Sequence, residues 1–193
     1  AIEDNHSNLW TMDVKSGSFV KIDTDNDPAP GRTFDASWSH DSKWITYSKN
    51  LESHLSAIFV YSVDEKKTRQ ITDGLADAIS PSFDAGGKYL YFLASTNFGP
   101  KTSWLEMSSI DHPTDRSAYL VVLPSDEPSP LIPETGDEPP PASAGSEAPK
   151  PKAPPSTAVR IDFNGINNRI LPLGVRPANL SSLNAGPAGT FFY

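Results

Sequence analysis

The feature that most constrains the fold is an internal repeat of about 45 residues. Ser37–Ser48 (SWSHDSKWITYS) aligns with Ser82–Leu93 (SFDAGGKYLYFL), so that aromatic residues and a lysine fall at matching positions. Each copy predicts a strand, a tight polar turn and a second strand of large apolar residues. A weaker repeat relates two hairpin-like segments, Asn8–Asp23 and Ala57–Thr72, and Ala185–Tyr193 (AGPAGTFFY) matches the turn and second strand once more. A recurring four-strand unit of this length is typical of a β-propeller blade.

Short β-branched and aromatic runs, each bounded by turn-forming residues, predict strands, and no run has the periodicity of a long helix. The expected strands are Leu9–Val14, Trp44–Ser48, Ala57–Val63, Tyr89–Ala94, Ala118–Leu123 and Val159–Phe163. Because propeller blades pack face to face, we interpret the aromatic residues of the repeats as core rather than as a ligand-stacking platform. They are Trp38, Trp44, Tyr47, Phe59, Tyr61, Phe83, Tyr89, Tyr91 and Phe92, and Trp44 and Tyr89 are expected to be equivalent buried positions.

Proline content divides the chain into three parts. The chain has 19 prolines, and most lie between residues 124 and 157, an acidic stretch with almost no large apolar residues. Such a stretch cannot offset the entropy of ordering, so we expect a disordered insert, with a solvated loop favoured over a Pro-rich ligand. Residues 1–123 are then propeller blades, and residues 158–193 are further, incomplete blade strands.

The expected fold is all-β, a partial β-propeller of about three to four blades, each an antiparallel four-stranded sheet. Closed propellers use roughly 4–8 blades, so the two terminal blades are expected to expose apolar faces and unpaired edges. The edge at Ala185–Tyr193 is the most exposed case, and it favours association of the chain into a homo-oligomer.

Composition excludes several classes of partner and site. The formal net charge of −8 argues against nucleic-acid binding, which needs a concentrated basic face. No apolar run approaches the roughly 18 residues of a membrane span. No signal peptide is recognisable, which favours the cytoplasm over the periplasm. The chain has 0 Cys, so disulfides and thiolate metal sites are excluded.

Two polar clusters invite a catalytic or metal-binding interpretation. His40 stands beside Ser39 and Asp41, but adjacent side chains point apart, so we interpret the cluster as a polar turn rather than a catalytic triad. His54 is placed in a loop between strands. The alternating acids of DTDND (residues 23–27) resemble the start of a calcium loop, but the positions that require Gly and Glu hold Pro28 and Phe34. An acidic turn between blades is the favoured interpretation, and no cofactor or metal is expected.

One loop stands out by its apolar residues. Thr96–Ser109 (TNFGPKTSWLEMSS) follows an expected strand and carries Phe98, Trp104, Leu105 and Met107. Apolar residues on a loop indicate contact with another blade, another subunit or a bound peptide. Packing within the molecule is favoured, and these four residues are the candidate interface.

The blade sequences resemble the propeller region of tricorn-like serine peptidases. The resemblance is carried, in order, by Phe34–Ser62, Gln70–Pro100, Arg116–Leu131, Val159–Leu173 and Ala185–Tyr193. The combination of YLYFLASTNFGP with YLVVLPSDEPSPL is more specific than single elements such as SWSHDSK, which TolB-like and dipeptidyl-peptidase-like propellers share.

The resemblance implies N-terminal propellers followed by a PDZ-like module and a C-terminal catalytic domain that carries the serine nucleophile and the histidine base. No residue of this chain matches those catalytic positions, so no catalytic residue is assigned. The implied role is access of peptide or unfolded-protein substrates to the parent enzyme, and assembly of the particle. A stand-alone TolB-like binding module and the propeller of a prolyl-oligopeptidase-like hydrolase are the alternatives.

Overall fold

The computed structural model describes residues 1–27, 33–97, 114–131 and 158–193. The described residues form four antiparallel sheets and one 3-10 turn, η1 (Ile166–Arg169). None of them forms a helix that is long and apolar enough to cross a membrane. The prediction of an all-β chain is confirmed.

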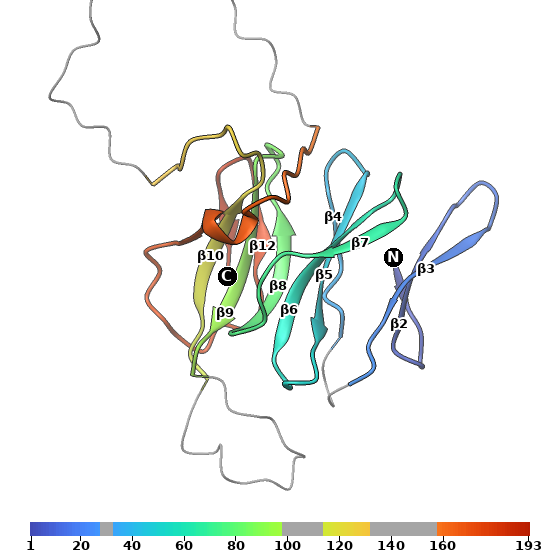
Figure 1. Cartoon of the computed structure of the whole chain (residues 1–193), viewed down its shortest axis with the longest axis horizontal. Coiled ribbons are helices and arrows are strands. Elements are labelled where there is room, and N and C mark those ends of the chain that lie inside the picture. Colours follow the sequence, from blue (N-terminus) through green and yellow to red (C-terminus); the bar gives the residue numbers. More distant parts are fainter. Residues whose placement is uncertain (28–32, 98–113, 132–157) are drawn as a thin grey trace, which may run out of the picture.

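The sheets follow one another along the chain from blue to red in Figure 1. The first contains β1 (Ile2–Glu3), β2 (Asn8–Met12) and β3 (Phe19–Thr24). The second contains β4 (Ser37–Trp38), β5 (Trp44–Asn50), β6 (Ser56–Ser62) and β7 (Lys67–Gln70). The third contains β8 (Asp77–Phe83), β9 (Tyr89–Ser95), β10 (Ser117–Val122) and β11 (Ile170–Pro172). The fourth pairs β12 (Asn184–Ala185) with β13 (Phe191–Phe192).

The second and third sheets are complete blades, because each strand pairs with the next one along the chain. The first sheet corresponds to the last three strands of a blade, and the fourth to the first two. The prediction of a partial propeller built from four-stranded antiparallel blades is therefore confirmed. In the first sheet β1 pairs with β2 as β5 pairs with β6 in the second, so β1 corresponds to the second strand of a blade.

The two copies of the repeat have the same backbone conformation and the same hydrogen bond in their turns. Ser42 and Gly87 are equivalent and both adopt left-handed conformations, with φ of 59° and 72°. The amide of Ser42 donates to the Ser39 carbonyl at 3.0 Å, and the amide of Gly87 donates to the Asp84 carbonyl at 2.9 Å. The same tight turn therefore joins β4 to β5 and β8 to β9.

Three apolar clusters hold the sheets together. The first lies between the first two sheets and includes Leu9, Ile45 and Tyr47. The second joins the two complete blades through residues such as Val60, Phe92 and Val121. The third packs the other face of the third sheet against the C-terminal segment and includes Tyr91, Leu120 and Leu183. Both faces of the complete blades are thus covered, as propeller packing requires.

This packing confirms most of the expected aromatic core. Tyr47, Tyr61, Phe83, Tyr91 and Phe92 are buried, and Trp44, Phe59 and Tyr89 are half-buried.

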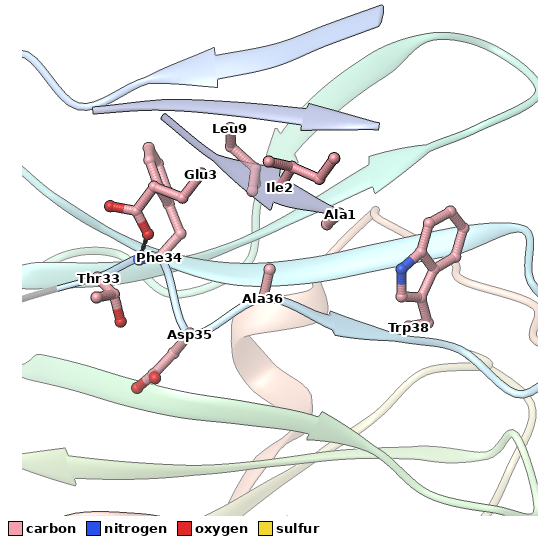
Figure 2. A pocket seen from close by; sticks show the side chains of 9 residues that line it. All are labelled: Ala1, Ile2, Glu3, Leu9, Thr33, Phe34, Asp35, Ala36 and Trp38. Carbon is pink, nitrogen blue, oxygen red and sulfur yellow. Dashed lines mark hydrogen bonds between the residues drawn. The ribbon is translucent and has the colours of Figure 1, made fainter. Parts of the chain in front are cut away.

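For Trp38 the prediction is wrong, since this side chain is 38% exposed although its equivalent, Phe83, is only 1% exposed. Phe83 is covered by the preceding sheet, β4–β7. Trp38 lies on the side of the first sheet, which covers this side chain only in part. It lines a cavity of about 370 Å³ instead, together with Ile2, Glu3 and Phe34 (Figure 2).

The expected strand Val159–Phe163 is also wrong, because these residues join no sheet. The edge of β10 is already paired with β11. Val159 and Ile161 instead pack between the two complete blades, where the Val159 amide donates to Asp41 at 2.8 Å.

Part of the predicted insert is described, up to residue 131, and the rest, residues 132–157, lies outside the described residues. Its first residues are held against the third sheet. The Ser125 amide and hydroxyl donate to Asp162 at 2.8 and 2.9 Å, and Glu127 pairs with Lys88. These contacts attach the start of the insert to the blade.

Candidate functional site

The strongest candidate for a binding site lies where the first strands of three successive sheets meet. β8 contacts both β4 and β12, so residues from three distant parts of the chain come together. They surround a pocket of about 300 Å³. Its lining consists of Asp35, Ala36, Ser37, Ser80, Pro81, Ser82, Ser182, Leu183 and Asn184. We call this the inner-strand pocket. In a closed propeller the blades surround a central channel, and we interpret this side of the sheets as the one that faces it.

Asp35 and Ser80 occupy equivalent positions of the repeat and have the same unusual backbone conformation. Their φ angles are 47° and 52°, in the left-handed region that non-glycine residues seldom adopt. The Ser80 hydroxyl donates to Asp35 Oδ2 at 3.1 Å, which links the two blades directly. Asp35 also lines the Trp38 cavity, and Figure 2 shows its side chain directed toward the third sheet. The second and third sheets therefore each direct one polar side chain, Asp35 and Ser80, toward this pocket.

The chemistry of the inner-strand pocket is acidic and polar. The Asp35 carboxylate belongs to none of the ion pairs found among the described residues. Serine hydroxyls contribute from all three segments. The Ser82 hydroxyl accepts a hydrogen bond of 3.0 Å from the Ala185 amide, which ties β12 to β8. The walls are thus cross-linked, and the described residues place one carboxylate among serine hydroxyls.

A buried ion pair close to these strands escaped the sequence analysis. Asp77, at the start of β8, is 0% exposed, and Arg116, next to β10, is 7% exposed. Arg116 Nη2 donates to Asp77 Oδ2 at 3.2 Å, and the Ser56 amide donates to Oδ1 at 3.0 Å. Arg116 Nη1 also donates to the Leu180 carbonyl at 3.2 Å. The pair joins two blades to the C-terminal segment. The sequence did contain a signal for this pair, because a charged residue stands at the start of each of two apolar strands.

The structure confirms that the cluster around His40 is a turn. The Ser39 hydroxyl donates to Asp41 Oδ1 at 2.6 Å and accepts from the Trp44 amide at 2.9 Å, while His40 is exposed. Burial raises the pKa of Asp41, but hydrogen bonds from Ser39 and from backbone amides outweigh it and hold the pKa below its usual value. His54 lies in the turn between β5 and β6, as expected.

The acidic run at residues 23–27 links neighbouring sheets, as predicted. The Tyr47 hydroxyl donates to Asp23 at 2.7 Å, and Lys49 pairs with the same carboxylate at 2.7 Å. Asn50 donates to Asp25 at 2.9 Å. Burial is the main reason that the pKa of Tyr47 is raised. The described residues contain no group of three His, Asp or Glu side chains that could hold a metal ion.

The candidate interface residues Phe98, Trp104, Leu105 and Met107 lie outside the described residues, so their role stays a prediction. A different apolar surface is described on the outer face of the first sheet. Ile2 is 45% exposed, Met12 38% and Phe19 55%. Trp10 lies opposite Ile2, and Phe19 lies opposite Met12, so the four share one face. We call this the outer face.

The outer face repeats a surface that is covered elsewhere in the molecule. In the weaker repeat Trp10 corresponds to Phe59 and Met12 to Tyr61, and both of these pack against the preceding sheet. At the other end of the array, Phe192 and Tyr193 are 65% and 63% exposed. Both ends of the sheet array therefore present apolar side chains, as expected for a partial propeller.

Comparison with known proteins places these features in a wider group. A family model described as the tricorn protease second beta propeller domain matches residues 1–193. Tricorn protease homolog 1 of Streptomyces coelicolor is 26% identical over 195 residues, which cover 100% of this chain and 17% of that protein. A tricorn protease homolog of Saccharolobus solfataricus is 27% identical over 63% of this chain and 11% of its own length.

A solved structure agrees with the fold. The crystal structure of the tricorn protease superimposes with a TM-score of 0.64 at 21% identity, over 94% of this chain and 16% of that one. The chain thus spans about a sixth of the length of the protein it resembles in structure.

Proposed function

The chain belongs to the family of the tricorn protease second β-propeller domain, and from this premise we propose that it guides peptide substrates toward a catalytic domain of a larger peptidase and takes part in its assembly. The observation that carries the first role is the inner-strand pocket, where three blades place polar side chains on the channel side of the sheets. A polar lining suits a peptide, whose backbone carries a donor and an acceptor at nearly every residue.

A narrowing of the channel tests this role in the full-length protein that contains the chain. Ser182 is exposed and lines the inner-strand pocket, so Ser182→Trp adds bulk without disturbing the core. We expect kcat/KM to fall severalfold for long unstructured peptides and to stay unchanged for short chromogenic substrates that need no guiding. Ser16→Trp, in the exposed turn between β2 and β3, is the matched control. Equal effects on both substrates, or no effect on either, would contradict substrate guiding.

The isolated chain is expected to have no peptidase or esterase activity. Among the described histidines, His6, His40 and His54, none is hydrogen-bonded through its ring to a serine hydroxyl, the arrangement that activates a serine nucleophile. The measurement is hydrolysis of unstructured peptides and of an activated ester by the purified chain. Hydrolysis that a serine-directed inhibitor abolishes would show that the assignment of catalysis to another domain is wrong.

The assembly role rests on the outer face and the apolar end at β13. We expect the purified chain to associate as its concentration rises, because both ends expose apolar side chains that blades normally cover. Moderate salt should not dissociate it, since the contact is not charge-driven. Light scattering over a range of concentrations gives the mass. Phe19→Lys should shift the chain toward monomer, whereas Val14→Lys, at an 86% exposed turn position, should not. A monomer at all concentrations would contradict association.

A further inference from the structure

The inner-strand pocket combines one carboxylate with several uncharged oxygen atoms. Asp35 supplies the carboxylate, and serines on β4, β8 and the segment before β12 supply hydroxyls. The Ser80 hydroxyl, which donates to Asp35 Oδ2, lies 3.4 Å from the Ser181 carbonyl oxygen. Among the described residues, the hydrogen-bond partner of the Asp35 carboxylate is this uncharged hydroxyl. A compact cation with several N–H donors is the complementary ligand.

The size and the overall charge of the protein favour the same class of ligand. A volume of about 300 Å³ is at the lower end of ligand pockets and accommodates the end of a peptide or one long side chain. The net charge of −8 attracts cations over a longer range. The left-handed φ of 47° at Asp35, repeated at Ser80 with 52°, sets the direction in which both side chains leave the backbone.

We propose that the inner-strand pocket binds a primary ammonium group of a peptide, with Asp35 as its counter-ion and the surrounding serine hydroxyls as acceptors. The proposal rests on the proposed function in that the ligand is a peptide. It adds the part of the peptide that is recognised. The ammonium group comes from the peptide N-terminus or from a lysine side chain, and both present the same three donors.

Binding of three short glycine–alanine peptides to the 193-residue chain distinguishes these sources, measured by NMR titration at low salt. One peptide has a free N-terminus and no lysine, the second is N-acetylated and contains one lysine, and the third is N-acetylated without lysine. We expect the first, the second or both to bind, and the third to bind at least fivefold more weakly. Binding should weaken as salt is added. Equal binding of all three peptides would overturn the proposal.

Variants locate the site. Asp35→Asn should weaken ammonium binding about fivefold or more, which is the effect of losing an exposed ion pair of about 1 kcal/mol. Glu52→Gln removes the same charge from an exposed turn and should leave binding unchanged. Ser182→Lys keeps Asp35 but places a competing ammonium group in the pocket, so it should abolish peptide binding. Thermal unfolding of each variant checks the fold. Equal effects of Asp35→Asn and Glu52→Gln would also overturn the proposal.

The outcome separates the two proposals. In one case, the three peptides bind equally, while Ser182→Trp still impairs cleavage of long peptides by the parent protein. Ammonium recognition is then wrong and substrate guiding stands. If ammonium binding is observed but Ser182→Trp has no effect on cleavage, the site exists and substrate guiding is wrong. If the three peptides bind equally and Ser182→Trp has no effect on cleavage, both ammonium recognition and substrate guiding are wrong.

Discussion

Replacement of Arg116 by methionine is expected to lower the free energy of unfolding by about 3 kcal/mol, because it takes the guanidinium away from the fully buried carboxylate of Asp77. The same guanidinium donates to the Leu180 carbonyl, so the contact between the third sheet and the C-terminal segment weakens as well. Chemical denaturation of the purified chain measures the change. Arg176→Met, at an exposed arginine, is the matched control and is expected to change stability by less than about 0.5 kcal/mol.

A double replacement tests the physical reason for this loss. If the cost comes from a buried charge that has lost its counter-charge, then Arg116→Met combined with Asp77→Asn should cost less than the sum of the two single changes. A strictly additive result would mean that the pair does not interact energetically. An unchanged midpoint for Arg116→Met alone would mean that the buried pair contributes nothing to the joint between the blades.

Tyr47→Ala and Phe92→Ala are each expected to lower the free energy of unfolding by about 3–5 kcal/mol, as when a buried aromatic site is emptied. The two residues are equivalent positions of the repeat, with exposures of 0% and 2%. Tyr47 stacks on Phe59 with ring centroids 5.7 Å apart, and Phe92 stacks on Tyr119 at 5.5 Å. Equivalent packing predicts similar effects, which denaturation midpoints of the two variants compare.

Three further variants serve as internal controls. Tyr47→Phe keeps the ring and loses the hydrogen bond to Asp23, and should cost only about 1 kcal/mol. Trp44→Ala and Tyr89→Ala, the pair that the repeat alone suggests as buried, should cost less than the Tyr47 and Phe92 changes, because both side chains are only half-buried. Unchanged midpoints for both Tyr47→Ala and Phe92→Ala would show that the blade alignment is wrong.

The sequence by itself determined the features that depend on neighbouring residues. Short aromatic and β-branched runs predicted strands at Trp44–Ser48 and Tyr89–Ala94, and the structure has them at Trp44–Asn50 and Tyr89–Ser95. The tight turns at Ser42 and Gly87 followed from polar and glycine residues between such runs. Because these preferences act within a few residues, a repeat in the sequence became a repeat in the structure.

Only the tertiary structure decided which segments meet. Ile170–Pro172 pairs with β10, whereas the more strand-like Val159–Phe163 packs between blades, since a single sheet edge accepts one partner. The exposure of Trp38 depends on whether a neighbouring sheet reaches it. Asp35 and Ser80 become partners only when two blades stack. Asp77 and Arg116 become partners only when β8 and β10 lie on either side of β9 in the third sheet. Sequence spacing cannot reveal such pairs, because the contacts that form the candidate site depend on how separate sheets are placed against one another.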